Sequence, residues 1–371
     1  MRSESKSAIL RLEDGSEYPG ESFGAARSVR GEVVFSTGMV GYPQSMTDPS
    51  YEGQILCLCY PLAGNYGIPG LSRDSFGIAR HFESDKIHVS ALVVSEHCEA
   101  PSHHSSRTSL AAWMENEGIP GISGVDTRAL TRRLRESGVM KGQVIVNGAE
   151  APDDQVETSQ PVAAVSCEAL RIYEASGESG PTIALLDCGV KSNILRVLLA
   201  TGARVIRLPW DHPLDGIEYD GLLLSNGPGD PKACTKTIAL VRRAMAKGKP
   251  IFGICLGNQI LALAAGADTY KLPYGHRGQN QPVQEKKSGR CFMSSQNHGY
   301  AVWENSLPEG WEPWFTNPND GTVEGIRSLK KPFSAVQFHP EGCPGPKDTQ
   351  FLIEDFVAQS AKFAETSRRP R

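Results

Sequence analysis

A cysteine lies in a sequence context typical of a catalytic nucleophile. Residues 253–257 are Gly-Ile-Cys-Leu-Gly, between an apolar run that ends at residue 254 and a helical pattern over 256–265. The Gly-x-nucleophile-x-Gly pattern between a strand and a helix is typical of a nucleophile elbow, in which small residues permit a strained turn. Such a turn places Cys255 at a helix N-terminus, where the helix dipole favours thiolate. It also leaves the Leu256 N–H to bind an oxyanion. The alternative is a core cysteine beside two incidental glycines.

A histidine and a glutamate could serve this thiol as a base and its orienting group. His339 and Glu341 flank a proline at the end of the apolar run 333–338. Because they are two residues apart on an extended backbone, their side chains share one side, and the proline ends the strand ladder. The pattern suits a histidine held by a carboxylate, as in hydrolase triads. Taken alone, it is also compatible with a surface turn.

A third motif, Ser-Asn-Gly-Pro-Gly-Asp-Pro at residues 225–231, follows the apolar run 221–224. Its glycines and prolines predict a tight loop at the carboxyl end of a strand, where open α/β sheets bind ligands. The glycine N–H groups of such a loop can stabilise an oxyanion. No Gly-Lys-Ser/Thr follows, so the loop is not a Walker motif. The alternative is a plain strand-to-helix turn.

The elements around these motifs alternate between strands and helices. Continuous apolar runs predict strands covered on both faces, and a parallel sheet with helices on either side. The expected strands are 182–186, 204–208, 221–224 and 250–254, and the expected helices are 193–200, 238–247, 256–265 and 348–363. Residues 274–338 are strand-like.

The length of 371 residues favours two domains. We expect a β-rich domain with two helices over 1–150 and an α/β domain over 182–363. Residues 151–181 are polar and rich in turn residues, which predicts a linker, with a possible short strand within 162–170. Residues 364–371 form a polar tail that we expect to be disordered.

The composition excludes several classes of protein. A net charge of −4 argues against a nucleic-acid binder, and no apolar run reaches the 18 residues of a membrane span. The N-terminus lacks a signal-peptide pattern, which favours a cytoplasmic location. An odd number of cysteines, nine, argues against a disulfide framework. No Cys or His spacing predicts a metal site.

The three motifs, in this order, resemble those of class I (triad-type) glutamine amidotransferases. The first half narrows the resemblance: residues 31–43, 47–51, 64–67 and 124–128 are similar to the N-terminal domain of the carbamoyl-phosphate synthetase small subunit. Residues 294–300 extend the match into the second half. The implied fold is α/β, with an N-terminal β-rich α+β domain followed by a doubly wound amidotransferase domain around a mostly parallel central sheet.

The resemblance implies hydrolysis of glutamine to glutamate and ammonia by a Cys-His-Glu triad of Cys255, His339 and Glu341. Backbone N–H groups near Gly229 and Leu256 would hold the oxyanion. The positions that match glutamine-binding residues of the family are Ser50, Gly227, Gly229, Leu256, Gln259, Asn297, Gly299 and Tyr300. Because Ser50 belongs to the first domain, the resemblance implies that the two domains pack together.

The resemblance also implies a partner. Ammonia would pass to a synthetase subunit or fused domain that makes carbamoyl phosphate from bicarbonate and ATP, for pyrimidine or arginine synthesis. ATP and magnesium are expected on that partner, and no cofactor or metal in this chain. Residue 258 is asparagine where many members have histidine, and relatives that use free ammonia have asparagine near this position but have lost the cysteine. Because Cys255 is present, we expect an active glutaminase. The alternatives are an amidotransferase of another pathway, such as anthranilate or GMP synthesis, and a non-hydrolysing regulatory module.

Overall fold

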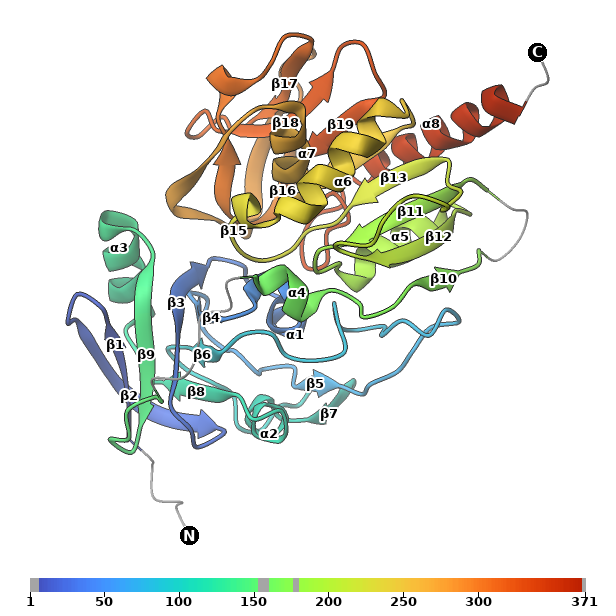
Figure 1. The fold of residues 1–371 in the computed structure, drawn as a ribbon. Helices are drawn as coiled ribbons and strands as arrows, with labels where there is room; N and C mark the ends of the chain where they lie inside the picture. The colour runs from blue at the N-terminus through green and yellow to red at the C-terminus, as the bar shows by residue number, and fades with distance from the viewer. Residues whose placement is uncertain (1–6, 153–159, 176–179, 369–371) are drawn as a thin grey trace. The chain divides into compact units, whose positions relative to one another are not determined.

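The computed structural model describes residues 7–152, 160–175 and 180–368 (Figure 1). The chain divides into two compact units. Unit 1 consists of Met1–Asp74 and Ala79–Thr158, and unit 2 consists of Ser75–Ile78 and Ser159–Arg371.

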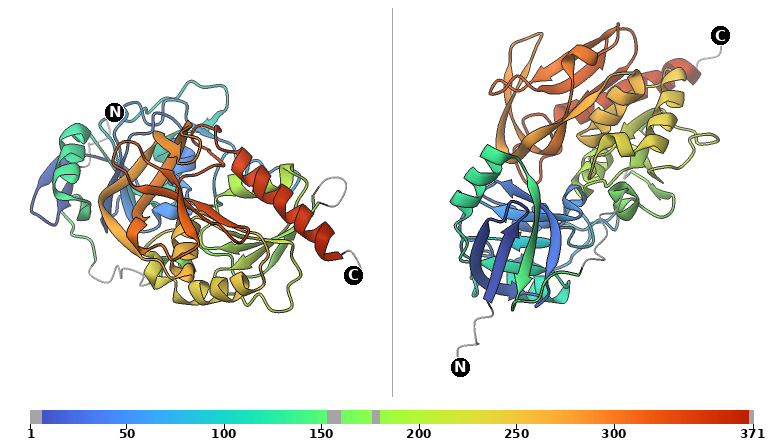
Figure 2. Two further views of the ribbon diagram at one scale, coloured as in Figure 1. Left: turned by 90° about the horizontal axis from the view of Figure 1, so that it is seen from above. Right: turned by 60° about the vertical axis from the view of Figure 1, so that its left-hand side comes forward.

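Unit 1 is built on a closed barrel, which is visible in the right-hand view of Figure 2. Its strand order is β1-β2-β8-β6-β4-β3-β9. Strand β1 shows why these segments form a barrel: Ala8, Leu10 and Leu12 alternate with more exposed residues and are buried. The barrel strands are β1 Ser7–Leu12, β2 Glu17–Gly24, β3 Val29–Ser36, β4 Gln54–Leu58, β6 Ala91–Val93, β8 Pro120–Ser123 and β9 Met140–Val146. The other elements of unit 1 are α1 Tyr42–Met46, the 3₁₀ helix Pro49–Tyr51, β5 Ile68–Pro69, β7 Ser106–Thr108, α2 Leu110–Asn116 and α3 Thr127–Ser137.

Unit 2 contains a ten-stranded sheet with the order β10-β12-β11-β13-β14-β19-β18-β16-β15-β17. The five strands from β12 to β19 in this order are parallel, and the rest pair antiparallel. The parallel group is β11 Thr182–Asp187, β12 Arg204–Pro209, β13 Gly221–Leu224, β14 Ile251–Ile254 and β19 Phe333–Val336. The antiparallel strands are β10 Arg171–Tyr173, β15 Thr269–Glu285, β16 Cys291–Val302, β17 Trp311–Thr316 and β18 Val323–Ser328.

Helices cover both faces of the parallel strands (Figures 1 and 2). Leu222 and Leu224 of β13 face the core that includes α6 Thr235–Ala246 and α7 Leu256–Ala265. Leu223 faces the opposite core, with α5 Ser192–Ala200 and α8 Phe351–Arg368. Burial on both faces explains the unbroken apolar runs of these strands. The predicted α/β fold is therefore confirmed. None of the described helices has the length and apolar character needed to cross a membrane.

Two local expectations are wrong. The possible strand within 162–170 is instead helix α4, Pro161–Val165, which has a proline in its first turn and buries Val162 in the core of unit 2. The expected tail is helical to Arg368, since α8 continues past residue 363 and buries Ala364. Residues 369–371 of that tail lie outside the described residues.

Candidate active site

Cys255 occupies the strained turn that the motif predicts. It lies between β14 and α7, with φ of 55° and ψ of −105°, in a region that L-residues rarely adopt. Its N–H donates to the carbonyl of Val336 at 2.8 Å, which fixes the turn to the neighbouring strand β19. The turn therefore places Cys255 at the N-terminus of α7 and at the carboxyl edge of the parallel strands.

The two glycines of the motif allow α7 to approach the sheet. A Cβ atom at Gly253 would lie 2.5 Å from the carbonyl oxygen of Gly257, and one at Gly257 would lie 2.2 Å from the carbonyl oxygen of Leu224. Neither space accommodates a side chain, because both obstacles are backbone atoms. The spacing of glycines around the cysteine thus has a packing cause that is independent of catalysis.

His339 and Glu341 form a buried pair joined to a lysine. The Nδ1–H of His339 donates to Oε1 of Glu341 at 2.7 Å. The ammonium group of Lys191 donates to the same oxygen at 3.0 Å and to the carbonyl of Gly342 at 2.9 Å. Side-chain exposure is 2% for His339, 0% for Glu341 and 3% for Lys191. The carboxylate therefore lies between two positive groups and is shielded from solvent.

These contacts set the protonation states of the pair. Burial acts to raise the pKa of Glu341, but Lys191 and His339 outweigh it and lower the pKa to about 2. Burial acts to lower the pKa of His339, but the Glu341 carboxylate outweighs it and raises the pKa to about 10. The neighbouring Cys255 thiol also raises the pKa of His339, which indicates that the sulfur lies close to the ring. Nε2 of His339 has no nitrogen or oxygen partner among the described residues.

Two further groups contact the sulfur of Cys255. Its thiol donates to the carbonyl of Asn297 at 3.5 Å, and Nε2 of Gln337 donates to the sulfur at 3.7 Å. The orientation of the Gln337 amide is fixed, because its Oε1 accepts hydrogen bonds from Asn258 Nδ2 and Gln259 Nε2, both at 3.1 Å. The N–H side of Gln337 therefore faces the sulfur, with Asn258 supporting that orientation.

Most of the predicted glutamine-binding positions lie in unit 2, and one of them, Asn297, contacts the Cys255 sulfur through its carbonyl. Leu256 follows Cys255, and a Cβ at Gly227 would lie 2.9 Å from its Cδ2 atom. Gln259 donates to the carbonyl of Tyr300 at 2.9 Å, which links α7 to β16. The positions in unit 2 come from three segments: Gly227 and Gly229 lie in the loop after β13, Leu256 and Gln259 lie on α7, and Asn297, Gly299 and Tyr300 lie on β16.

Ser50 belongs to unit 1. It lies in the 3₁₀ helix Pro49–Tyr51, where its backbone N–H donates to Oδ1 of Asp48 at 2.9 Å. Its role in glutamine binding stays a prediction.

Sequence reasoning missed Lys191 and Gln337. Lys191 follows the buried strand β11 at the same carboxyl edge as Cys255, so position in the sheet was a usable signal. Gln337 precedes His339 by two residues, and an extended backbone puts both on one side. The signal for Lys191 also requires knowing which strands are neighbours in the sheet.

Comparisons with known proteins agree with this architecture. Residues 184–359 match the family model "Glutamine amidotransferase class-I", and residues 10–144 match "Carbamoyl-phosphate synthase small chain, CPSase domain". The carbamoyl phosphate synthase arginine-specific small chain of Saccharomyces cerevisiae is 44% identical over 98% of this chain and 91% of its own length.

Longer proteins also match. The multifunctional protein CAD of Squalus acanthias is 49% identical over 94% of this chain, but the match covers only 16% of that protein. The chain thus spans about a sixth of the length of such relatives. On the near full-length match to the yeast small chain and the two family models, this chain belongs to the carbamoyl phosphate synthase small-chain family, with a class I glutamine amidotransferase domain in its second half.

Proposed function

We propose that this chain hydrolyses L-glutamine to glutamate and ammonia, with Cys255 as nucleophile, His339 as general base and acid, and Glu341 as its orienting group. The observation that carries this proposal is the convergence of the three side chains. A strained cysteine at a helix N-terminus meets a histidine whose other nitrogen is held by a buried carboxylate. The membership of the family supports glutamine as the substrate.

The first half of the reaction forms a thioester. The Cys255 thiol gives its proton to Nε2 of His339, the general base, and the sulfur attacks the carboxamide carbon of glutamine, while the negative charge moves to the carbonyl oxygen. Backbone N–H groups of Leu256 and Gly229 stabilise that oxyanion. His339 gives its Nε2 proton to the nitrogen, the C–N bond breaks, and ammonia leaves. Glu341 and Lys191 hold the ring in place throughout, because Nδ1 stays bonded to the carboxylate.

The second half releases glutamate. Neutral His339 takes a proton from water, the hydroxide attacks the thioester carbon, and the C–S bond breaks to regenerate the thiolate. Within unit 2, Gln259 of α7 and Asn297, Gly299 and Tyr300 of β16 bind the glutamine substrate. The Gln337 amide, which donates to the sulfur, stabilises the thiolate that leaves when the thioester is hydrolysed.

The ammonia passes to a carbamoyl-phosphate synthetase subunit or fused domain, which combines it with bicarbonate. ATP and magnesium act on that partner. The names of the relatives include arginine-specific small chains and multifunctional proteins, which supports either pathway assignment. A cytoplasmic location stays a prediction.

The test is glutamate release from glutamine by the full chain, with and without a synthetase partner. Cys255→Ser should abolish release under both conditions, whereas Cys291→Ser should not, because Cys291 is an exposed cysteine at the start of β16. Equal glutamate release by the two variants would overturn the proposal.

A further inference from the structure

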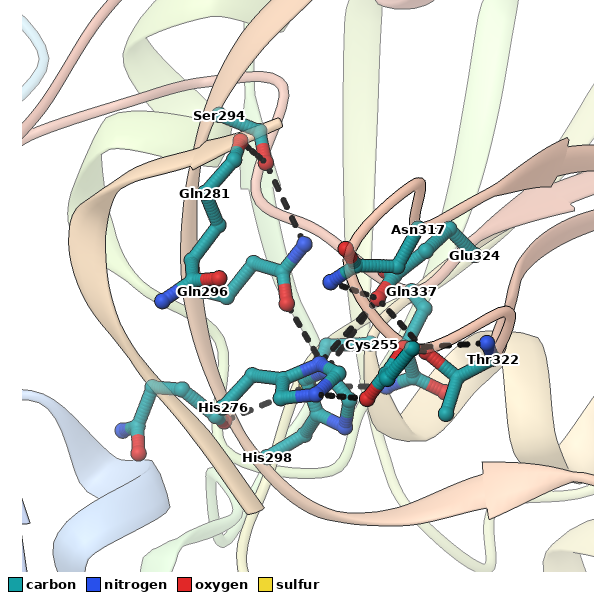
Figure 3. Close-up of polar contacts among 12 residues, drawn as sticks. Cys255, His276, Gln281, Ser294, Gln296, His298, Asn317, Thr322, Glu324 and Gln337 are labelled. Atoms are coloured by element: carbon teal, nitrogen blue, oxygen red, sulfur yellow. Dashed lines mark hydrogen bonds and ion pairs between the residues drawn. The ribbon is translucent and has the colours of Figure 1, made fainter. Parts of the chain in front are cut away.

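A second cluster of buried titratable side chains lies on the antiparallel strands of unit 2. His276 comes from β15, His298 from β16 and Glu324 from β18. One potential ligand atom from each lies within 4.8 Å of the other two, and all three residues are buried. Figure 3 shows both imidazoles and the Glu324 carboxylate turned toward one another. The reaction proposed above uses none of these side chains.

In each imidazole, the ring nitrogen that points away from Glu324 already has a hydrogen-bond partner. Nε2 of His276 donates to Oδ2 of Asp320 at 2.8 Å, and Nδ1 of His298 donates to the carbonyl of Tyr300 at 2.8 Å. Histidines that bind metals generally donate their other ring N–H to a carboxylate or a backbone carbonyl in this way. The contacts leave His276 Nδ1 and His298 Nε2 as the atoms that face Glu324.

The atoms that His298 Nε2 meets in the described part of the chain are hydrogen-bond acceptors, like Nε2 itself in the neutral ring. Because His298 donates through Nδ1, its neutral ring presents a lone pair at Nε2. Its neighbours there are Gln296 Oε1 at 3.1 Å and Glu324 Oε1 at 4.0 Å, and both atoms are acceptors.

A flip of the Gln296 amide that exchanges its oxygen and nitrogen would present an N–H group to His298, but it would break the hydrogen bond that Gln296 Nε2 donates to Ser294. The Ser294 hydroxyl donates to the carbonyl of Gln281 at 2.9 Å, so its oxygen accepts from Gln296 Nε2 at 3.3 Å. This chain of contacts, drawn in Figure 3, keeps Gln296 Oε1 toward His298.

The Glu324 carboxylate is also incompletely satisfied. Its Oε1 accepts from His276 Nδ1 at 3.2 Å, from Thr322 at 3.4 Å and from Asn317 at 3.5 Å. Its Oε2 is buried and has no hydrogen-bond partner within the described part of the chain. An unpaired carboxylate oxygen in a residue that is 0% exposed is costly, and a cation is the group that would satisfy it.

We propose that His276 Nδ1, His298 Nε2 and the Glu324 carboxylate bind one divalent transition-metal ion of the zinc type. Two imidazoles and a carboxylate are a donor set suited to zinc, and Gln296 Oε1 or a water completes a tetrahedron. Zinc bonds of about 2.0–2.2 Å place ligand atoms roughly 3.3 Å apart. The separation from Glu324 Oε1 is 3.2 Å for His276 Nδ1 and 4.0 Å for His298 Nε2, and all three ligand atoms lie within 4.8 Å of one another, so the side chains must move closer together around the ion. The ion replaces the proton that His276 shares with Glu324.

The position of the site indicates a structural ion. It connects three strands that are neighbours in the sheet, because β16 lies between β15 and β18. His276 and His298 are opposite each other in the register of β15 and β16. The residue before His298 is Asn297, whose carbonyl contacts the Cys255 sulfur. A metal here would stabilise the wall beside the nucleophile without contacting substrate.

The test is a direct titration of the full chain after treatment with a chelator. Zn²⁺ is added in competition with a chromophoric chelator, and Co²⁺ is added separately to detect the visible absorption of a tetrahedral site. We expect one ion per chain with a Kd below about 1 µM. His276→Asn and Glu324→Gln should each weaken binding by roughly 100-fold. Circular dichroism checks that the variants are folded.

Two controls separate this site from other ligands. His212→Asn removes a loop histidine, and Cys255→Ser removes the only cysteine assigned a reactive role, so both should retain the ion. The proposal is overturned if the unmodified chain binds no ion more tightly than about 10 µM. It is also overturned if binding survives His276→Asn or disappears with Cys255→Ser. Because the unmodified chain is measured first, an unfolded variant does not prevent a decision.

Discussion

His339 and His276 are both buried histidines bonded to a fully buried glutamate, but they differ in what the second ring nitrogen meets. His339 gives Nδ1 to Glu341, and Cys255 interacts with the same ring. His276 gives one nitrogen to Asp320 and the other to Glu324. The first arrangement can move a proton to and from a reacting group, whereas the second joins strands.

The pKa shifts of His339 and His276 do not distinguish the catalytic arrangement from the structural one. Burial alone would lower both pKa values, yet neighbouring carboxylates raise that of His339 to about 10 and that of His276 to about 9. A perturbed pKa therefore identifies a buried ion pair, not a catalytic one. What distinguishes them is the presence of a nucleophile beside one ring and of a second carboxylate beside the other.

The largest expected difference is in glutamate release. His339→Asn removes the proposed base and acid and should lower kcat by about 1,000-fold or more. His276→Asn should change kcat by no more than about threefold, because that ring contacts no proposed reacting group. Steady-state glutamate release by both variants measures this directly. A comparable loss in the two variants would mean that the assignment of roles is wrong.

The second-largest expected difference is between substitutions of the two buried glutamates, Glu341 and Glu324. Glu341→Gln keeps the size of the side chain but removes the charge that orients His339 and accepts from Lys191, so kcat should fall by roughly 100-fold. Glu324→Gln should act mainly on stability, with a loss of about 1–3 kcal/mol in the free energy of unfolding measured in urea. The contrary result would be an active Glu341→Gln variant, which would show that orientation by this carboxylate is dispensable.

The side-chain amides beside Cys255 and His298 provide a matched pair of smaller effect. Gln337→Leu removes the donor to the Cys255 sulfur and should slow alkylation of that thiol by iodoacetamide about tenfold, as expected for loss of one hydrogen bond to a charged atom. Gln296→Leu, beside His298, is the control and should leave the alkylation rate within twofold. Mass spectrometry of the labelled peptide identifies the alkylated cysteine. An unchanged rate in Gln337→Leu would exclude this donor role.

The smallest effect concerns the pH dependence of stability. The pKa of His339 rises from 6.5 to about 10 on folding, so its contribution to stability is fully present below pH 6.5 and is lost as the pH rises toward 10. His339→Asn lacks this contribution. The fall in the urea midpoint between pH 6.5 and 10 should therefore be smaller in the variant than in the unmodified chain. Parallel pH profiles would argue against a protonated His339 in the folded state.

The motif around Cys255 was predictable because its cause is local. The two glycines, the strand before them and the helix after them are contiguous in sequence, and steric contact with backbone requires that spacing. The pairing of His339 with Glu341 was predictable because the two residues are close in sequence, but the expected extended backbone was wrong: Pro340 and Glu341 lie in a turn that the Gly342 N–H closes by donating to the His339 carbonyl at 3.1 Å. The parallel sheet of unit 2 was predictable from its continuous apolar runs, because strands that are buried on both faces are apolar at every position.

The remaining features depend on contacts between distant segments. Lys191 reaches Glu341 across 150 positions, and Gln337 meets the amides of Asn258 and Gln259 across 79 and 78. The closed barrel of unit 1, the helix α4 and the continuation of α8 past residue 363 also depend on packing against other segments, which local sequence preferences do not encode. The structure also accounts for Asn258, whose side chain holds Gln337 toward the sulfur.

By itself, the sequence determined which residues could form a nucleophile, a base and an orienting acid, because each of these functions depends on a short contiguous pattern. Only the tertiary structure decided that they meet, that a lysine neutralises their carboxylate, and that a second pair of histidines converges with Glu324 on three other strands. The reason is physical: strand neighbours are chosen by the burial of whole faces, and that choice brings together side chains that no spacing along the chain connects.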